Sequence, residues 1–292
     1  MAATRYKYIR PEDIRQLKHY EFGVKALVEG YLSGRHRSKE RGASIEFHEY
    51  RQYVQGDDPA LVDWRVFARS DRHYLKTFEQ ETNMECHLFV DSSASMGYCE
   101  EGDITKLEYA SFFAACLAWL VISKNDKVSL QLFDEQIRLF LDAGSTRSHL
   151  HQLLTALENN KPGERTSLAT ALERSAPLIK RKGTLVILSD FFDEPEAIFK
   201  ALNPYLHRGF RVHLFHVLDP AELTLPKLGL ARFNDLESAE HLVVHTDQLR
   251  DLWRDEMHEH VQKLRRLSAR RKVDYALVKT TDNWFNLFDR LA

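Results

Sequence analysis

Residues 85–91 read ECHLFVD, and residues 183–190 read GTLVILSD. Both are short, mostly apolar runs that end in an aspartate. A continuous apolar run of this length is typical of a strand buried on both faces of a parallel sheet. Helical patterns separate these runs from one another. This alternation predicts βαβ units and an α/β fold with a doubly wound, mostly parallel sheet that has helices on both faces.

The same patterns predict the remaining elements of the chain. We expect further strands at 127–134, 136–141, 210–218 and 273–280, and helices at 104–123, 146–158, 167–179, 194–206, 246–271 and 283–291. Residues 220–246 form a strand-rich excursion. Residues 1–30 hold one or two helices, and two strands at 44–53 and 74–78 enclose a turn and a short helix. We therefore expect an N-terminal α+β extension at 1–82 and a larger domain at 83–292.

Composition narrows the class of protein. Of the 292 residues 43% are hydrophobic and 29% are charged, as in a soluble globular protein. A net charge of −2 implies no global basic field, so nucleic-acid binding is not expected. Three cysteines provide no disulfide framework. The first residues show no apolar core of the kind that a signal peptide needs, so we expect no signal peptide in them, and the apolar run at 110–122 is too short for a transmembrane segment. These features predict a cytoplasmic protein.

Oxygen-bearing side chains stand where predicted strands end. Asp91, Ser93 and Ser95 follow the first strand in a D-x-S-x-S spacing, Thr166 precedes a helix, and Asp190 ends a later strand. Ligands of doubly wound sheets bind at the carboxyl ends of the strands. Each residue alone favours a helix N-cap. Together they offer two carboxylates and three hydroxyls, which suit Mg²⁺ or another divalent cation such as Ca²⁺ or Mn²⁺.

These five positions resemble the metal-ion-dependent adhesion site of von Willebrand factor A (vWA) domains. The segments are DSSAS, the threonine of GERTSLATAL and the aspartate of LVILSD. The resemblance implies a vWA-like domain and a non-catalytic protein-interaction module, in which an acidic residue of a protein partner completes the coordination of the metal. Three neutral hydroxyls make a weak site, which can stay empty without the partner.

An upstream segment resembles the bacterial family called "domain of unknown function 58". Its members carry E-x-R-x-Y-x-x-G-D-D, then D-W-x-x-x-A-R. These positions are Glu49, Arg51, Tyr53, Gly56, Asp57, Asp58, Asp63, Trp64, Ala68 and Arg69. The resemblance covers about residues 20–217, and it implies a MoxR-type AAA+ ATPase as partner in assembly or maturation. Many members carry N-terminal membrane spans, a feature that we do not transfer to this chain. The three aspartates are also expected to pair with Arg51, Arg65 and Arg69.

An enzymatic alternative is a Mg²⁺-dependent phosphate-ester hydrolase with Asp91 as nucleophile. Against it, Ser93 stands where a second carboxylate is expected, and no Walker loop, G-x-G-x-x-G motif or nucleophile elbow occurs. His258 and His260 lie two positions apart, so they face different sides of a helix and are expected at the surface. The basic residues within 263–272 are expected to form a solvated helix end, with contact to RNA or anionic lipid as the alternative.

Overall fold

The computed structural model describes residues 6–17, 45–54, 62–70, 72–80, 85–163, 167–234, 236 and 241–290. The chain divides into two compact units. The larger unit comprises residues 1–30 and 84–292, and the smaller comprises residues 31–83.

The larger unit is built on a six-stranded sheet with the order β10-β7-β6-β3-β4-β5. These strands are β3 (Glu85–Asp91), β4 (Lys127–Phe133), β5 (Ile137–Gly144), β6 (Gly183–Ser189), β7 (Arg211–Leu218) and β10 (Asp274–Lys279). All neighbours pair in parallel except β4 and β5. Only residues 134–136 join that pair, too short a connection for a parallel crossover. The predicted doubly wound, mostly parallel α/β sheet is confirmed.

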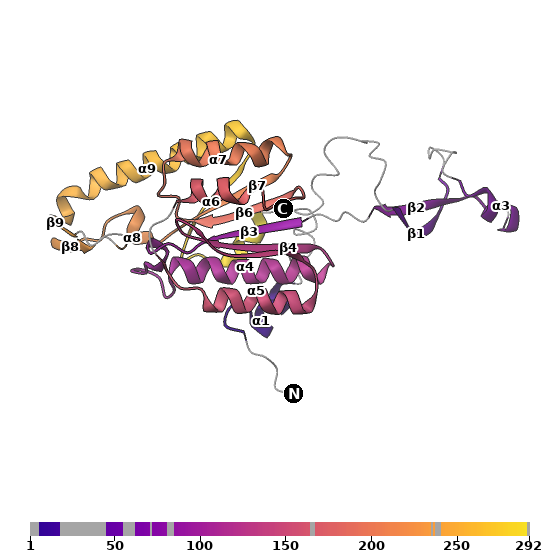
Figure 1. The fold of residues 1–292 in the computed structure, drawn as a ribbon, viewed down its shortest axis with the longest axis horizontal. Coiled ribbons are helices and arrows are strands. Elements are labelled where there is room, and N and C mark those ends of the chain that lie inside the picture. Colours follow the sequence, from indigo (N-terminus) through magenta and orange to yellow (C-terminus); the bar gives the residue numbers. More distant parts are fainter. Residues whose placement is uncertain are drawn as a thin grey trace. The chain divides into compact units, whose positions relative to one another are not determined.

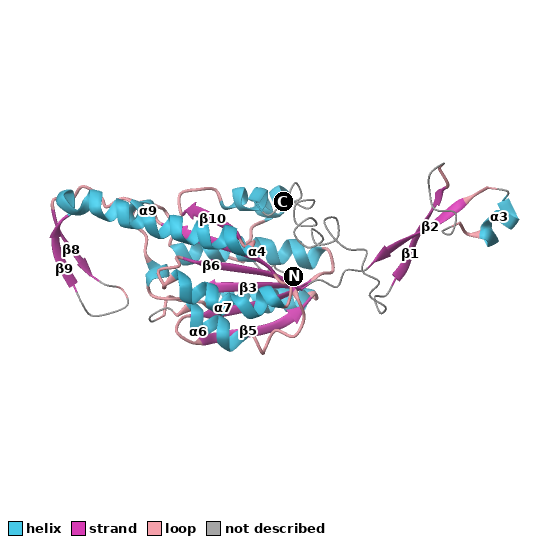
Figure 2. Cartoon of the chain, turned by 90° about the horizontal axis from the view of Figure 1, so that it is seen from above, coloured by secondary structure: helices cyan, strands magenta, loops and turns pink. Residues whose placement is uncertain are grey.

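Helices cover both faces of this sheet (Figures 1 and 2). The first face carries α1 (Pro11–Leu17), α4 (Lys106–Ser123), α5 (Arg147–Asn159) and the 3₁₀ helix η4 (Trp284–Arg290). The second carries α6 (Leu168–Ser175), α7 (Pro195–His207) and α9 (Thr246–Arg271). Alternate residues of β3 serve the two cores: Leu88 and Val90 pack into the first, and Phe89 packs into the second. A strand buried on both faces must be apolar throughout, as the sequence pattern predicted.

Helix α4 is the central helix of the first core. By length and composition it could cross a membrane, and it is the one such helix among the described residues. Within the protein 83% of that apolar segment is buried. Its first turn is fixed by a capping box, in which the Thr105 hydroxyl accepts from the Glu108 N–H and the Glu108 carboxylate accepts from the Thr105 N–H. The helix is therefore a buried core helix, as expected from the sequence.

Two predicted helices differ from the observed ones. The helix expected over 167–179 ends at Ser175, although Ala176 keeps right-handed helical angles (φ −54°, ψ −40°), because Pro177 has no N–H with which to continue the helical hydrogen bonds. The last helix is 3₁₀ rather than α. The strand-rich excursion is confirmed: it contains the short helix α8 (Pro220–Leu223) and the antiparallel pair β8 (Leu230–Asn234) and β9 (His241–His245).

The smaller unit contains an antiparallel pair, β1 (Ile45–Gln52) and β2 (Tyr74–Gln80), with α3 (Trp64–Ser70) between them in sequence. The two strands and the short helix expected here are confirmed. Ring contacts gather on His73: its ring centroid lies 4.4 Å from that of Phe67, 6.4 Å from that of Trp64 and 6.2 Å from that of Tyr53. The expected division at residue 82 places α1 in the extension, whereas α1 packs on α4 and Leu17 is fully buried in the core of the larger unit.

We predict that the larger unit loses stability at low pH because His87 is buried. It is 2% exposed in β3, its Nδ1 lies 2.7 Å from Ser129 Oγ, and burial lowers its pKa from 6.5 to about 4. The unfolded chain binds the proton first, so stability is complete above pH 6.5 and falls as the pH drops toward 4, by up to about 3 kcal/mol. Denaturant titrations across this window measure the loss. The His87→Leu/Ser129→Ala control must reduce the slope by the His87 contribution, whereas buried His213 and His216, whose pKa values burial also lowers, keep the remainder. An unchanged slope contradicts the assignment.

Candidate functional site

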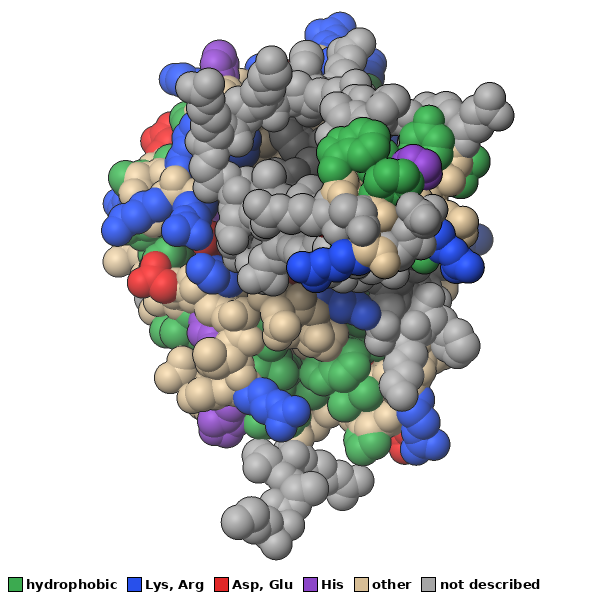
Figure 3. Space-filling model, turned by 90° about the vertical axis from the view of Figure 1, so that its right-hand side faces the viewer, with side chains coloured by type: hydrophobic (Ala, Val, Ile, Leu, Met, Phe, Trp, Pro, Cys, Tyr) green, Lys and Arg blue, Asp and Glu red, His purple; other side chains and the backbone are tan. Residues whose placement is uncertain are grey.

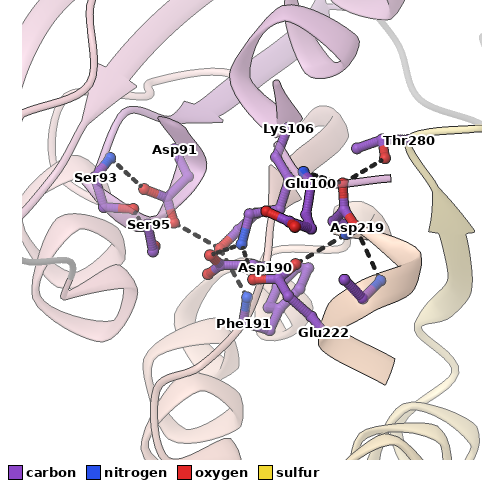
Figure 4. Close-up of polar contacts among 12 residues, drawn as sticks. Asp91, Ser93, Ser95, Glu100, Lys106, Asp190, Phe191, Asp219, Glu222 and Thr280 are labelled. Carbon is purple, nitrogen blue, oxygen red and sulfur yellow. Dashed lines mark hydrogen bonds and ion pairs between the residues drawn. The ribbon is translucent and has the colours of Figure 1, made fainter. Parts of the chain in front are cut away.

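Three fully buried aspartates lie at the carboxyl edge of the sheet (Figure 4). Asp91 ends β3, Asp190 follows β6, and Asp219 follows β7. All three side chains are fully buried. Strands β3 and β6 are neighbours from which the chain continues in opposite directions across the sheet, and ligands of doubly wound folds bind at such a switch point. The position expected for Asp91 and Asp190 is therefore the position observed.

The loop after β3 brings three predicted site residues together. The Ser93 N–H donates to Asp91 Oδ1 at 2.9 Å, and the hydroxyl oxygens of Ser93 and Ser95 lie 3.0 Å apart. The chain then turns through the 3₁₀ helix η3 (Ser95–Gly97). Asp91 Oδ2 accepts a hydrogen bond of 2.6 Å from Ser189, the last residue of β6. The D-x-S-x-S segment thus presents a carboxylate and two hydroxyls from one short loop.

Asp190 uses only one of its two carboxylate oxygens. Oδ2 accepts from Lys106 Nζ at 2.7 Å, whereas Oδ1 is buried without a hydrogen-bond partner among the described residues. The next residue, Phe191, has a left-handed φ of 50°, which is strained for a side chain with a Cβ. Its N–H donates at 3.0 Å to Ser189 Oγ, the same hydroxyl that donates to Asp91. One hydroxyl therefore links Asp91 to the loop after β6.

Burial and mutual repulsion make this edge electrostatically unfavourable. Burial and the negative charge of Asp190 raise the pKa of Asp91 from 3.8 to about 7, although hydrogen bonds from Ser189 and Ser93 oppose the shift. A divalent cation would neutralise both carboxylates, and the donor set is all oxygen. The described residues contain no group of three or more His, Cys, Asp and Glu side chains suited to a metal. A cation here would depend on hydroxyls and water for its remaining ligands.

Thr166, the fifth predicted ligand, lies outside the described residues. The segment that leads to it is held at the site, because the Gly163 N–H donates to the Ser92 carbonyl at 2.7 Å. A Cβ atom at Gly97 would lie 2.9 Å from Pro162 Cγ, so the loop after β3 and this segment are in close contact. The structure therefore brings together four of the five predicted ligands and the chain just before the fifth.

Sequence reasoning missed Asp219, the third of the fully buried aspartates at the strand ends. It caps α8, and its carboxylate accepts from the Ala221 N–H at 2.9 Å and the Glu100 N–H at 3.0 Å. Thr280, which follows β10, donates to it at 3.4 Å. The Glu222 carboxylate in turn accepts from the Asp219 N–H at 2.8 Å. The signal was available, because D-P-A-E after an apolar strand is a capping-box pattern.

Lys106 was also missed. It is the first residue of α4, it is fully buried, and its ammonium lies 2.7 Å from Asp190 Oδ2 and 2.6 Å from Glu222 Oε1 (Figure 4). Burial alone lowers the pKa of Lys106, but the two carboxylates outweigh this effect and raise it, so the ammonium stays charged. The lysine therefore joins the loop after β6 to α8.

His260 corrects the expectation that both helix histidines lie at the surface. Its Nε2 lies 2.9 Å from the Phe191 carbonyl oxygen, and the side chain is half-buried. The buried stripe of α9 includes Met257, Val261 and Leu264, and His260 lies three residues after the first of these. That spacing placed His260 on the packed side of the helix, so the surface prediction was wrong for this residue.

The basic end of α9 takes part in helix packing. Lys263 Nζ lies 2.8 Å from Glu194 and 2.7 Å from Glu196, and Arg271 donates to Asn203 Oδ1 at 2.9 Å. These contacts hold α9 on α7. On the face shown in Figure 3, described Lys and Arg side chains are spread over several separate places rather than gathered in one continuous patch.

The signature residues of the upstream segment belong to the smaller unit. Glu49 and Arg51 lie in β1, and Tyr53 follows it. The Asp63 N–H donates to the Tyr74 carbonyl at 2.9 Å, and Trp64 and Arg69 are exposed residues of α3. Gly56, Asp57 and Asp58 lie outside the described residues, so their pairing with the neighbouring arginines stays a prediction.

The sheet order, the two helical layers and the loops at the carboxyl edge define an α/β protein of vWA-like fold. The fold is similar to that of an aerotolerance-related membrane protein from Bacteroides fragilis, with a TM-score of 0.50 and 16% identity over 71% of this chain and 96% of that one. The VWA domain of SpRpn10 matches with a TM-score of 0.43 and 7% identity over 70% and 93% of the two chains.

The chain belongs to the family described as "Protein of unknown function DUF58", which matches residues 49–265. It is 28% identical over 235 residues to the uncharacterized proteins Rv1480 of Mycobacterium tuberculosis and Mb1516 of Mycobacterium bovis, which covers 78% of this chain and 72% of each relative. The resemblance seen in the upstream segment is therefore confirmed at the level of the family.

Proposed function

We propose that this protein is a non-catalytic, divalent-metal-dependent protein-interaction module. Asp91, Ser93, Ser95, Thr166 and Asp190 would hold Mg²⁺, Ca²⁺ or Mn²⁺. The observation that supports this most is the pair of buried aspartates: Asp190 Oδ1 has no hydrogen-bond partner among the described residues, and burial together with the charge of Asp190 raises the pKa of Asp91. Few buried polar atoms in folded proteins lack a hydrogen-bond partner, and a ligand, an ion or a water molecule often provides the missing contact.

The bound cation would take a carboxylate oxygen of a partner protein as one of its ligands. The protein's own residues prepare this contact. Ser189 and the Ser93 N–H fix the orientation of the Asp91 carboxylate, and the η3 turn holds the hydroxyls of Ser93 and Ser95 within 3.0 Å of each other. Phe192, which follows the strained Phe191, is 41% exposed and would add an apolar contact beside the charged one.

The proposed partner is a MoxR-type AAA+ ATPase that presents an Asp or Glu, with this protein as its cytoplasmic adaptor in the assembly or maturation of other proteins. The family resemblance supports this choice of partner. A contact of this kind is made only when metal and partner carboxylate are both present, so it is reversible and suits an adaptor that must release its client.

Equilibrium binding of the full chain to the purified cognate ATPase tests the proposal. We expect binding in Mg²⁺, at least about tenfold weaker binding in EDTA, and the same loss in Asp91→Ala with Mg²⁺ present. The exposed variant Asp251→Ala is the matched control and must bind as the wild type does. Binding that ignores both EDTA and Asp91→Ala contradicts the mechanism. Turnover of a phosphate ester that Asp91→Asn abolishes would instead support the hydrolase alternative.

A further inference from the structure

A fully buried lysine already occupies part of the candidate metal site. Lys106 Nζ contacts Asp190 Oδ2 at 2.7 Å, and both side chains are inaccessible to solvent. The other oxygen of the same carboxylate has no partner among the described residues. Asp190 thus has one oxygen that binds an ammonium and one that remains available. The same aspartate would have to serve the lysine and the divalent cation together.

Two like charges on one carboxylate oppose each other. In a buried site of low dielectric, an ammonium bound to Asp190 repels any cation that approaches the second oxygen. It also reduces the negative charge that would attract that cation. A lysine at this place therefore lowers the affinity of the site for metal, while it keeps the buried aspartate neutralised when metal is absent.

Two carboxylates, those of Asp190 and Glu222, share the ammonium of Lys106. Glu222 contacts Lys106 Nζ at 2.6 Å through Oε1, and its Oε2 accepts from the Asp219 N–H at 2.8 Å. The Glu222 carbonyl accepts from Trp253 Nε1 at 2.7 Å, which ties this residue to α9. A firmly held Glu222 draws part of the ammonium's charge away from Asp190.

We infer that Lys106 is a resident cation that competes with the divalent metal for Asp190, and that Glu222 sets the strength of this competition. The inference rests on the proposed function and deepens it. Lys106 and Glu222 act through Asp190, so they are positioning residues that tune metal affinity rather than metal ligands. Without its lysine the site would hold metal tightly; with it, the metal is held weakly until a partner's carboxylate adds its own affinity.

Variants of the two residues are expected to shift metal affinity in opposite directions. Calorimetric titration of the full chain with Mn²⁺ should give a dissociation constant at least about tenfold lower for Lys106→Met and about threefold higher for Glu222→Gln. If Lys106 and Glu222 only supported the fold, both substitutions would weaken Mn²⁺ binding. Lys200→Met removes the same charge from an exposed position of α7 and should leave the constant unchanged.

A paired variant protects the test against misfolding. Lys106→Met leaves the buried carboxylates of Asp190 and Glu222 without their cation. Lys106→Met/Glu222→Gln removes both charges of the Lys106–Glu222 ion pair, so only the Asp190 carboxylate loses its cation. This double variant should bind Mn²⁺ more tightly than Glu222→Gln alone. If the wild type binds Mn²⁺ but loss of the lysine leaves affinity unchanged or weaker, the inference is overturned and the proposed function stands. If neither the wild type nor any lysine variant binds Mn²⁺, the metal site itself is refuted.

Discussion

The Asp219→Ala variant should lose about 4 kcal/mol of unfolding free energy in the larger unit. The carboxylate is fully buried, and its removal leaves the N–H groups of Ala221, Glu100 and Glu101 and the Thr280 hydroxyl without their acceptor. The Ala221 N–H and the Thr280 hydroxyl are buried, and each costs about 1–3 kcal/mol when it is unpaired, whereas Glu100 and Glu101 are exposed residues whose N–H groups can bond to water. The loss of the α8 cap adds about 1 kcal/mol. Chemical denaturation followed by tryptophan fluorescence measures the change.

Two further variants serve as comparisons for Asp219→Ala. Asp219→Asn keeps one acceptor oxygen and should lose about half as much stability. Asp251→Ala removes an aspartate from an 81% exposed position and should change stability by less than about 0.5 kcal/mol. If Asp219→Ala is as mild as Asp251→Ala, then the network around α8 does not contribute to the stability of the larger unit.

The Asp91→Asn variant is expected to raise stability in EDTA above pH 7 by about 2 kcal/mol. The folded-state pKa of Asp91 is raised from 3.8 to about 7, so the folded state binds the proton more strongly than the unfolded chain. The cost of the charge grows as the pH rises from 3.8 and is complete above about 7. The neutral amide avoids this cost. Removing an unfavourable buried charge from a functional site increases the stability of the folded protein.

The pH dependence distinguishes this explanation from a packing effect. The stability gain of Asp91→Asn should shrink as the pH falls toward 3.8 and vanish below it, where the wild-type carboxyl is neutral in both states. Thermal melts of the wild type and the variant in EDTA across this range measure it. A gain that is independent of pH, or a loss of stability above pH 7, rules out a stability cost from the buried charge of Asp91, to which burial and repulsion by Asp190 both contribute.

The strand pattern was sufficient to predict the sheet and two of the three fully buried aspartates at its strand ends. Apolar runs that end in a polar residue mark the carboxyl edge, because both faces of a central parallel strand are buried. Asp91 and Asp190 were found in this way. Asp219 follows the run RVHLFHVL in the same manner, so the same rule identifies it when it is applied to every strand.

Lys106 could not be found by that rule. Helix α4 is apolar nearly all round, so its sequence periodicity gives no orientation for the one lysine in its first turn. Only the three-dimensional structure shows that this turn faces Asp190 and Glu222, residues 84 and 116 positions away in the chain. A lysine in a mostly apolar, buried helix does indicate an ion pair, but it does not identify the partners.

Direct measurement of metal binding tests the central claim, that Asp91 and the hydroxyls after it form a divalent-cation site. The full chain should be titrated with Mg²⁺ by isothermal calorimetry, beside Asp91→Asn under the same conditions. We expect one weakly bound ion per chain in the wild type and at least about a hundredfold weaker binding in the variant. An absence of binding in the wild type, or binding that Asp91→Asn leaves unchanged, would contradict the claim.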